Sequence, residues 1–402
     1  MTELDADVVV IGAGIVGLTA ARAVQQRRGG QVLVLDKADH PAAHQTGRNS
    51  GVVHSGLYYR PGSAKATLVA DGRARLERYC DERSLPYDRC GKVVVATSAD
   101  ELPVLGELAR RGAANGVAVE RIGPAQLHDV EPHVRGLAAL SVPSTAITDY
   151  RAVASSIADD LVADGGALRT GVEVRSIHPL PGGGVALDHT TGRVRARWLL
   201  NCAGLHSDRV AAMAGVDTGV SIVPFRGEYH QLAPSARHLV RHLVYPVPDP
   251  RWPFLGVHMT RMVDGSVHVG PNAVLALGRE AYEGGVDGRD VLALARDPGL
   301  RRLAARYWRT GAAELLRSRS ERLLLGDVRR LLPEATSTDL RPAGAGIRAQ
   351  ALGRDGTLLD DFAFATSPHG VHVLNAPSPA ATASFAIAEV IADRLDRLVG
   401  AG

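Results

Sequence analysis

The chain of 402 residues can hold one to three domains, with two as the natural expectation, and 45% hydrophobic residues indicate a globular protein with a sizeable core. A formal net charge of +3 gives no indication of nucleic-acid binding. Three irregularly spaced cysteines fit neither a disulfide framework nor a zinc motif, so we expect no metal and a reducing, cytoplasmic environment.

Residues 8–36 predict a strand, a helix and a second strand in immediate succession. Val8–Ile11 and Val32–Leu35 are continuous apolar runs, typical of parallel strands buried on both faces. Leu18–Arg28 between them is rich in alanine and predicts a helix. This compact βαβ unit favours an α/β domain.

The turn between the first strand and the helix has the spacing of a dinucleotide fingerprint. Gly12 allows the tight turn, Gly14 lets a diphosphate approach the backbone, and Gly17 lets the helix pack on the strand. The helix N-terminus offers N–H groups and a partial positive charge to that diphosphate. Asp36, at the end of the second strand, is placed to bind a ribose hydroxyl. The alternative is a Gly-rich turn in a plain βαβ unit, and the fingerprint does not separate FAD from NAD.

The next segments alternate between loop, helix and strand. Residues 37–62 lack a period and are rich in polar residues and glycine, which is typical of a functional loop. Ser63–Leu85 predicts a helix and Lys92–Thr97 a strand. Ser98–Asn115 predicts a helix that begins with a capping box of Ser98 and Glu101.

The middle of the chain predicts further parts of the first domain. Arg151–Asp164 is an amphipathic helical segment, and Ala167–Ile177 predicts one strand. Gly182–Gly184 indicates a hairpin turn, and Arg197–Cys202 predicts another buried strand.

Residues 220–345 differ in character from the rest of the chain. Short strands with proline and glycine are expected at Val220–Ala233, Phe254–Met259 and Ser266–Gly270, and basic helices at Arg289–Tyr307 and Ala312–Arg317. The strands favour a second, mostly antiparallel domain. The basic helices would either lie on an anionic membrane surface or present an ordinary solvated face.

The C-terminal region returns to the pattern of the first domain, with a strand at Val371–Leu374 and a helix at Ala380–Leu398. We therefore expect an α/β plus α+β protein. Residues 1–82, 150–215 and 346–402 would form a Rossmann-type dinucleotide-binding domain, and residues 83–149 and 216–345 an antiparallel substrate-binding domain.

Three regions of the chain resemble the D-amino-acid-oxidase-like superfamily of FAD-dependent oxidoreductases: the fingerprint, the strand end at Cys202–Gly204, and the C-terminal strand and helix. Within it, the chain is similar nearly end to end to the L-2-hydroxyglutarate oxidase/dehydrogenase family. The similar stretches are Thr46–Ser63, Val223–Tyr229, Tyr245–Arg261, Gly270–Tyr282, Gly344–Gln350 and Asn375–Ser384. The chain departs from the family at Arg48, where His is common, and at His230, where a second Tyr is common.

The resemblance implies FAD bound in a glutathione-reductase-like Rossmann domain. The residues that it implies for FAD are Gly12, Gly14, Ile15, Val16, Gly17, Asp36, Lys37, Thr46, Asn49, Ser50, Gly51, Val174, Ala203, Gly204, Pro377, Ser378, Pro379, Ala380 and Ala381. Small residues at Ala203 and Gly204 would allow close backbone approach. The turn at Pro377–Ala381 enters a helix, so its N–H groups would face the flavin pyrimidine ring.

The resemblance also implies the reaction, which is oxidation of L-2-hydroxyglutarate or a close L-2-hydroxy acid to the 2-oxo acid, with hydride transfer to flavin N5. The substrate-binding residues would be Tyr59, Tyr229, His258, Arg348 and Ser378. Arg348 suits a substrate carboxylate because its guanidinium forms a bidentate fork. The electron acceptor would be oxygen, a quinone or a carrier, with peripheral contact at the inner membrane face as one option.

The expected catalytic residues are His54, His258 and Arg348. His54 lies in the flavin-contacting loop, and an imidazole can take the hydroxyl proton near neutral pH. The alternative for His54 is a loop histidine that bonds only the backbone or the flavin. His258 shares a strand face with Thr260, whereas Arg261 points the other way. Two other functions stay open: an amino-acid or N-methyl-amino-acid oxidase of the same fold, and a non-catalytic FAD-binding scaffold or regulator.

Overall fold

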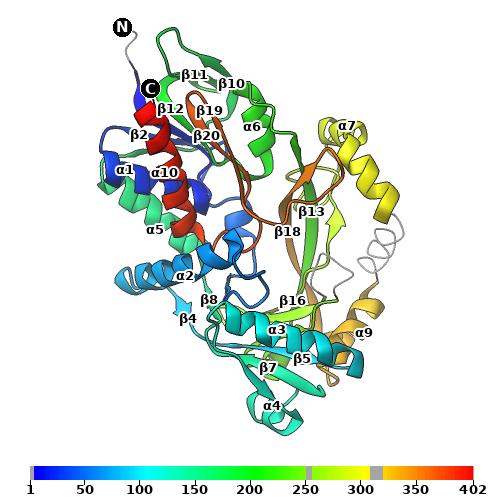
Figure 1. Ribbon diagram of the computed structural model, residues 1–402. Helices are drawn as coiled ribbons and strands as arrows, with labels where there is room; N and C mark the ends of the chain where they lie inside the picture. The colour runs from blue at the N-terminus through cyan, green and yellow to red at the C-terminus, as the bar shows by residue number, and fades with distance from the viewer. Residues whose placement is uncertain (1–3, 250–255, 308–319, 402) are drawn as a thin grey trace.

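The computed structural model describes residues 4–249, 256–307 and 320–401, which form two large sheets with helices packed on both (Figure 1). The first sheet has the order β10-β11-β12-β1-β2-β9, with β20 beside β12 and β19 beside β20. Its strands are β1 (Ala6–Ile11), β2 (Val32–Leu35), β9 (Ala167–Arg169), β10 (Val174–Pro179), β11 (Val185–His189), β12 (Gly192–Asn201), β19 (Ala363–Ser367) and β20 (Gly370–Asn375).

Both faces of the first sheet are buried, as the apolar runs predict. Val8 and Val10 of β1 belong to one hydrophobic cluster, and Val9 and Ile11 to another. The first cluster holds the helices α1 (Ile15–Arg28), α2 (Ala64–Glu82), α5 (Tyr150–Ala163) and α10 (Ser384–Ala401), and the second holds α6 (Ser207–Met213). In Figure 1, α1, α5 and α10 lie on one side of this sheet and α6 on the other.

The second sheet has the order β17-β13-β16-β15-β14-β5-β7-β6, and β18 pairs with β13. Its strands are β5 (Lys92–Ala96), β6 (Glu120–Ile122), β7 (Ala138–Val142), β13 (Val220–Leu232), β14 (Leu243–Pro246), β15 (His258–Arg261), β16 (Val267–Gly270), β17 (Val274–Leu275) and β18 (Leu340–Gly353). Every strand pair in it is antiparallel except β14–β5, so the expected antiparallel sheet is confirmed for the described strands.

Helices also cover the second sheet. These are α3 (Leu102–Ala114), α4 (Pro124–Val130), α7 (Gly288–Arg296) and α9 (Glu321–Leu331). A small third sheet joins β3 (Val52–Val53), β8 (Ala146–Thr148) and β4 (Tyr87–Asp88). Short 3₁₀ turns complete the structure: η1 (Gln45–Gly47), η2 (Ala99–Glu101), η3 (Gly204–His206), η4 (Pro234–Leu239) and η5 (Ser337–Asp339).

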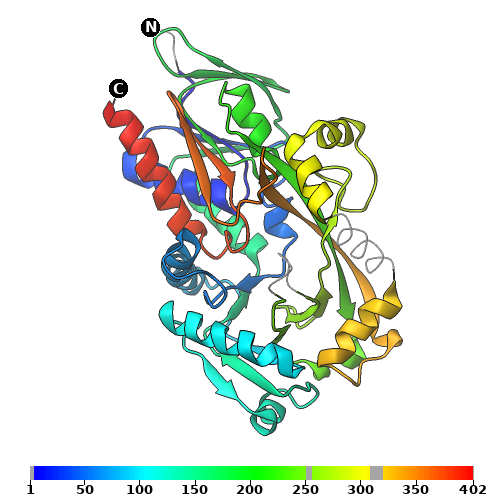
Figure 2. The same ribbon diagram turned by 45° about the vertical axis from the view of Figure 1, so that its right-hand side comes forward.

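The long ribbon of β13 and β18 belongs to the second sheet and reaches the first, where Ala351 N of β18 donates to Asn375 Oδ1 of β20 (Figures 1 and 2). The expected domain boundary at residue 346 falls inside β18. The domain limits themselves stay a prediction. No helix within the described ranges is long and apolar enough to cross a bilayer.

Four expectations about helices and strands are wrong. The segment Ala167–Ile177 is two strands, because Gly171 turns the chain with a φ of +70° after β9. Ser98 makes no capping bond. Instead Glu101 Oε2 accepts from the backbone nitrogen of Thr97 at 2.6 Å, and a 3₁₀ turn precedes α3.

The C-terminal helix begins at Ser384 rather than Ala380, because Ala380–Ala383 form turns first. The basic helix expected at Arg289–Tyr307 is interrupted at Asp297, where α7 ends. The helix expected at Ala312–Arg317 lies outside the described residues, as do Phe254 and Leu255 of the strand expected at Phe254–Met259. Gly256 and Val257 are not in a strand, and β15 begins only at His258.

Candidate active site

One cavity of about 1160 Å³ collects nearly all the expected site residues, between the carboxyl ends of β1, β2 and β12 and the second sheet. It exceeds the roughly 300–1000 Å³ of typical ligand pockets. The expected residues that line it are Gly12, Gly14, Ile15, Val16, Gly17, Asp36, Lys37, Thr46, Asn49, Ser50, His54, Tyr59, Val174, Ala203, Gly204, Tyr229, His258, Arg348, Pro377, Ser378, Pro379, Ala380 and Ala381.

Gly51 is the exception among the expected residues. It has a φ of +65°, and a Cβ there would lie 2.8 Å from the carbonyl oxygen of Thr148. Gly51 therefore turns the loop and does not line the cavity.

The fingerprint has the geometry that its glycines predict. Gly12 has a φ of +111°, and a Cβ there would lie 2.4 Å from Cys202 O. A Cβ on Gly17 would lie 1.9 Å from Gly12 O, so α1 packs on the turn only without a side chain. At Gly14 a Cβ would meet only Thr46 Oγ1, at 3.3 Å. Gly14 therefore leaves open space at the N-terminus of α1, whereas Gly12 and Gly17 are needed for backbone packing.

Asp36 and Thr46 bind the backbone around the start of α1. Asp36 accepts from the backbone nitrogens of Ala13 at 2.6 Å and Ala38 at 2.8 Å, one with each carboxylate oxygen. A carboxylate has about four lone-pair sites, so acceptors remain for a ribose hydroxyl. Thr46 Oγ1 accepts from the backbone nitrogen of Ile15 at 3.0 Å and so caps α1 from the 37–62 loop.

Two expected cofactor contacts have structural partners in the chain itself. Asn49 Nδ2 donates to Thr46 O at 2.6 Å, and its Oδ1 accepts from Gly51 N at 2.8 Å, so its amide braces the loop. Lys37 forms an ion pair with Glu280. The same carboxylate lies 2.8 Å from Nε2 of His206. Although burial acts to raise it, hydrogen bonds from His206 and Lys37 lower the pKa of Glu280 to about 2.

The turn at Pro377–Ala381 reaches the cavity before its helix begins. Ala380 N donates to Pro377 O at 2.8 Å, so one N–H expected for a cofactor is satisfied inside the turn. Because α10 starts at Ser384, the positive end of the helix lies further along the chain than the sequence predicts.

Two histidines face the other end of the cavity. Ser378 Oγ lies 3.2 Å from His54 Nε2, and the backbone nitrogen of His54 donates to Thr382 Oγ1 at 3.1 Å. His258 Nδ1 lies 2.8 Å from Gly256 O. A carbonyl oxygen only accepts, so Nδ1 carries the proton and Nε2 is an acceptor.

Both imidazoles are held neutral. Burial, with the nearby charge of Lys92, lowers the pKa of His54 to about 3. Burial also lowers the pKa of His258 to about 4, although its hydrogen bond to Gly256 opposes the shift. Each imidazole therefore has a lone pair free to accept a proton, but burial makes it a weaker base than an ordinary histidine.

The cavity face of the second sheet carries the substrate candidates. Arg348 on β18 lies opposite Phe225 of β13, and Tyr229 comes from β13 itself. His258 and Thr260 share one face of β15, and Met259 belongs to a cluster on the other, as the alternation predicts.

Several residues around the histidines were not predicted from the sequence. Tyr58 and Tyr245 line the cavity, and the Tyr245 ring stacks on His258 at 4.2 Å between centroids. Thr382 holds the His54 backbone, and Lys92 lies behind the tyrosines. A signal was present for Lys92: it is a lysine in an otherwise apolar run predicted to be a strand.

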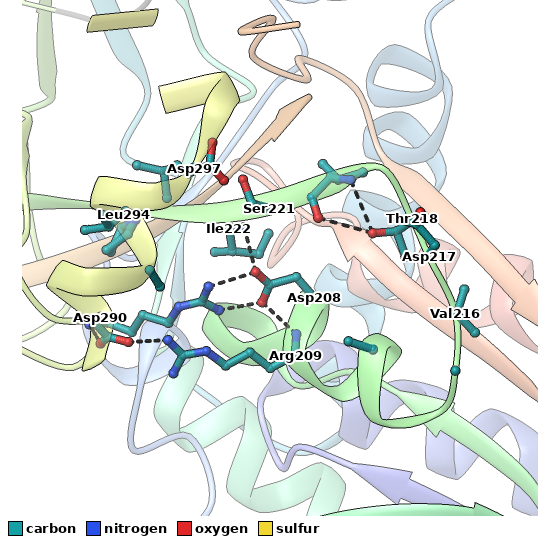
Figure 3. Close-up of a pocket in the computed structure, with 17 residues that line it drawn as sticks. Asp208, Arg209, Val216, Asp217, Thr218, Ser221, Ile222, Asp290, Leu294 and Asp297 are labelled. Carbon is teal, nitrogen blue, oxygen red and sulfur yellow. Dashed lines mark hydrogen bonds and ion pairs between the residues drawn. The ribbon is translucent and has the colours of Figure 1, made fainter. Parts of the chain in front are cut away.

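A second cavity of about 580 Å³ lies beside α6, α7 and β13 (Figure 3). Four of its charged residues are paired with one another: Arg279 Nη2 donates to Asp208 at 2.7 Å, and Arg209 pairs with Asp290. None of the expected site residues lines it. We assign it a structural role, joining the loop after β17 to α6. In the described parts of the chain, no group of three or more His, Cys, Asp or Glu residues could hold a metal ion.

Comparisons with known proteins agree with this geometry. The family described as FAD dependent oxidoreductase matches residues 7–394. The L-2-hydroxyglutarate dehydrogenase of Indibacter alkaliphilus is 43% identical over 97% of this chain and 98% of its own. That of Escherichia coli strain K12 is 42% identical over 98% of this chain and 94% of its own. L-alpha-glycerophosphate oxidase from Mycoplasma pneumoniae, solved with FAD bound, has a TM-score of 0.79 at 20% identity, covering 99% and 95% of the two chains.

Proposed function

The chain belongs to the FAD-dependent oxidoreductase family and, within it, to the L-2-hydroxyglutarate dehydrogenases, and we propose that it oxidises L-2-hydroxyglutarate to 2-oxoglutarate with FAD as cofactor. One observation supports this beyond the family. A single cavity joins the dinucleotide fingerprint to two neutral histidines and an arginine. These are the groups that oxidation of a hydroxy acid requires: a cofactor cradle, a proton acceptor and a carboxylate ligand.

The residues at the end of the cavity that holds the glycine fingerprint fit FAD. The turn at Gly12 and the packing of Gly17 leave no room for side chains, and Gly14 keeps the helix mouth open. We propose that Gly14, Asp36 and the 46–50 loop hold the adenosine and diphosphate. Ala203, Gly204 and the Pro377–Ala381 turn would then lie along the remainder of the cofactor.

When bound, FAD supplies the two-electron acceptor that takes the α-hydrogen as hydride. The chain's own groups do the rest. Arg348 holds a carboxylate of the substrate, and His54 takes the hydroxyl proton on its imidazole. A negative substrate beside His54 favours the protonated imidazole, so the substrate itself raises the basicity of the group that receives its proton.

His258 is the second candidate for the base. Its Nδ1 donates to Gly256 O, which leaves Nε2 as an acceptor of fixed orientation, and Tyr245 stacks on the ring. The Nε2 of His54 instead lies next to Ser378 Oγ, in the turn that we propose to lie along the cofactor. We assign the base to His54 and a substrate-binding role to His258, with Tyr59 and Tyr229 as further substrate contacts.

Anaerobic addition of substrate tests the proposed function. We expect L-2-hydroxyglutarate to bleach the yellow flavin of the purified protein, because two electrons leave the substrate for the flavin. A panel of L-2-hydroxy acids, amino acids and N-methyl amino acids serves as the comparison. Bleaching only by amino acids would assign the protein to amino-acid oxidation, and a flavin that stays yellow throughout would indicate a scaffold.

Replacing Gly14 with leucine should abolish flavin retention. Gly14 has an ordinary φ of −77°, so the backbone tolerates a side chain, but that side chain fills the space in front of α1. Gly326→Leu is the matched control, because a Cβ at that position on α9 meets nothing within 4 Å. The measurement is the flavin-to-protein absorbance ratio. A Gly14→Leu protein that keeps stoichiometric FAD would contradict the cradle.

The route of the electrons after the flavin is a finer proposal. We propose oxygen, a quinone or a carrier as acceptor, with peripheral contact to an anionic membrane on the side of α7. The exposed apolar side chains Val286, at 70%, and Leu292 support such contact beside the arginines of this helix. Binding to anionic vesicles would test it, and its absence would count against the membrane contact alone.

A further inference from the structure

Lys92 is a buried lysine beside the active-site cavity, and the mechanism above does not use it. Its side chain is 2% exposed. No ion pair of Lys92 with a carboxylate occurs among the described residues. Its ammonium instead lies over two aromatic rings, 4.4 Å from the centroid of Tyr58 and 5.1 Å from that of Tyr245. A buried charge without a carboxylate partner is costly, so its presence calls for a reason.

The register of the second sheet directs Lys92 toward the substrate end of the cavity. Lys92 and Val94 lie two positions apart on β5 and share a face, and Tyr245 of β14 is the cross-strand partner of Val94. Met259 of β15 lies opposite Val244, so His258 projects from the same face as Tyr245. Three neighbouring strands therefore present an ammonium, a tyrosine and an imidazole to one side.

The groups that face Lys92 are neutral or positive. Tyr58 and Tyr245 have pKa values raised by burial, so both phenols are neutral. His54 and His258 each have a lowered pKa, to which the charge of Lys92 contributes. Burial alone lowers the pKa of Lys92 to about 7, with no acidic group opposing the shift. Among the described residues, the groups around Lys92 thus supply no negative charge to balance its ammonium.

A substrate with two carboxylates would supply that charge. Arg348 would account for one carboxylate. Of the other cations that line this end of the cavity, Lys65 is paired with Asp360, Arg111 with Glu107, and Arg60 is exposed. Resting on the proposed function, we propose that Lys92 is a positioning residue that selects a dicarboxylic substrate, by stabilising the second carboxylate through the Tyr58 and Tyr245 wall. Lys92 does not line the cavity, so its charge acts across the rings rather than by contact. In a low-dielectric wall a unit charge acts over several ångströms with little screening.

The test compares two ligands that differ only in the second carboxylate. L-2-Hydroxyglutarate and L-2-hydroxypentanoate are titrated into the flavin-loaded enzyme without oxygen, giving a dissociation constant and a limiting reduction rate for each. We expect Lys92→Met to weaken binding of the dicarboxylate roughly 10–100-fold and to leave that of the monocarboxylate unchanged. The limiting rate should change little, because Lys92 touches no reacting atom.

The pH dependence of dicarboxylate affinity is a second measurement, and a mere loss of packing in the variant would not change it. Because the dianion favours the protonated ammonium, affinity in the parent enzyme should be full below pH 7 and fall as pH rises above it. This limb should disappear in Lys92→Met. Lys92→Arg should keep the dicarboxylate preference and extend it to high pH, because arginine stays charged.

Lys65→Met is the matched control, since the ammonium of Lys65 is already paired with Asp360 at 2.8 Å. Flavin content and thermal melting confirm that each variant is folded. Equal weakening for both ligands in Lys92→Met, or loss of preference in Lys65→Met instead, would overturn the proposal. Binding of 2-oxoglutarate against 2-oxopentanoate, followed by the flavin spectrum, separates the two hypotheses. If the parent enzyme prefers 2-oxoglutarate and Lys92→Met loses that preference, but L-2-hydroxyglutarate does not reduce the flavin, the proposed reaction fails and the role of Lys92 stands.

Discussion

Replacing His54 with alanine is expected to slow anaerobic flavin reduction about 10²–10⁴-fold while FAD stays bound. The rate falls because the substrate hydroxyl loses its proton acceptor. FAD should be retained because the loop is tied to Thr382 through the backbone nitrogen of His54, which alanine keeps. Stopped-flow absorbance of the flavin measures the rate, and the visible spectrum measures the bound cofactor.

His258→Ala is the informative comparison. It removes an imidazole of similar burial from the same cavity, with its stacking on Tyr245, so a general loss of packing would affect both variants alike. We expect the His54 variant to be the slower. A fully loaded His54→Ala protein that reduces at the parent rate would move the role of base to His258.

The structure also changes the expected pH signature of His54. An ordinary imidazole would give kcat/KM an acidic limb near pH 6.5. Because burial and Lys92 lower the pKa of His54 to about 3, the free enzyme should keep its acceptor neutral down to pH 5. A limb near neutral pH must then come from another group, and its persistence in His54→Ala would show this directly.

Arg348→Ala is expected to cost about 2–5 kcal/mol in kcat/KM for L-2-hydroxyglutarate, since a carboxylate would lose its cation inside a partly closed cavity. Arg348→Lys should recover only part of the loss, because lysine lacks the bidentate fork. The exposed Arg341 on the same strand provides the control substitution Arg341→Ala. Steady-state kinetics, measured on variants with the flavin content of the parent enzyme, test this role. A kcat/KM of Arg348→Ala close to that of the parent would show that Arg348 does not bind the substrate.

The fingerprint could be predicted from the sequence because its geometry is local. The spacing of Gly12, Gly14 and Gly17 fixes a turn whose partners lie within one βαβ unit. The strand at Val32–Leu35 matches the structure residue for residue for the same reason. The helix starts at Ser98 and Ala380 were wrong because capping depends on which side chain reaches a backbone nitrogen, and Glu101 does so in place of Ser98.

The substrate end of the cavity depends on contacts between distant strands. His54 comes from a loop, His258 from β15 and Arg348 from β18, and no local pattern places them around one cavity. The resemblance to a family supplied them. Lys92 was not predicted because periodicity indicates only that its strand is buried. The proposed role of Lys92 depends on Tyr58 and Tyr245, which pack on it from other segments of the chain.

The first sheet has a consequence for how the protein is made. Its fingerprint strand β1 pairs with β12, which pairs in turn with β20, and Thr19 Oγ1 of α1 donates to Ser384 O, 365 positions away, at 3.2 Å. A nascent chain synthesises the glycines of the cradle first and the strand and helix that complete it last. The cofactor site is therefore unfinished until ribosomal synthesis has passed α10. Loading of FAD is then a late, post-translational event, and C-terminally truncated chains should accumulate without flavin.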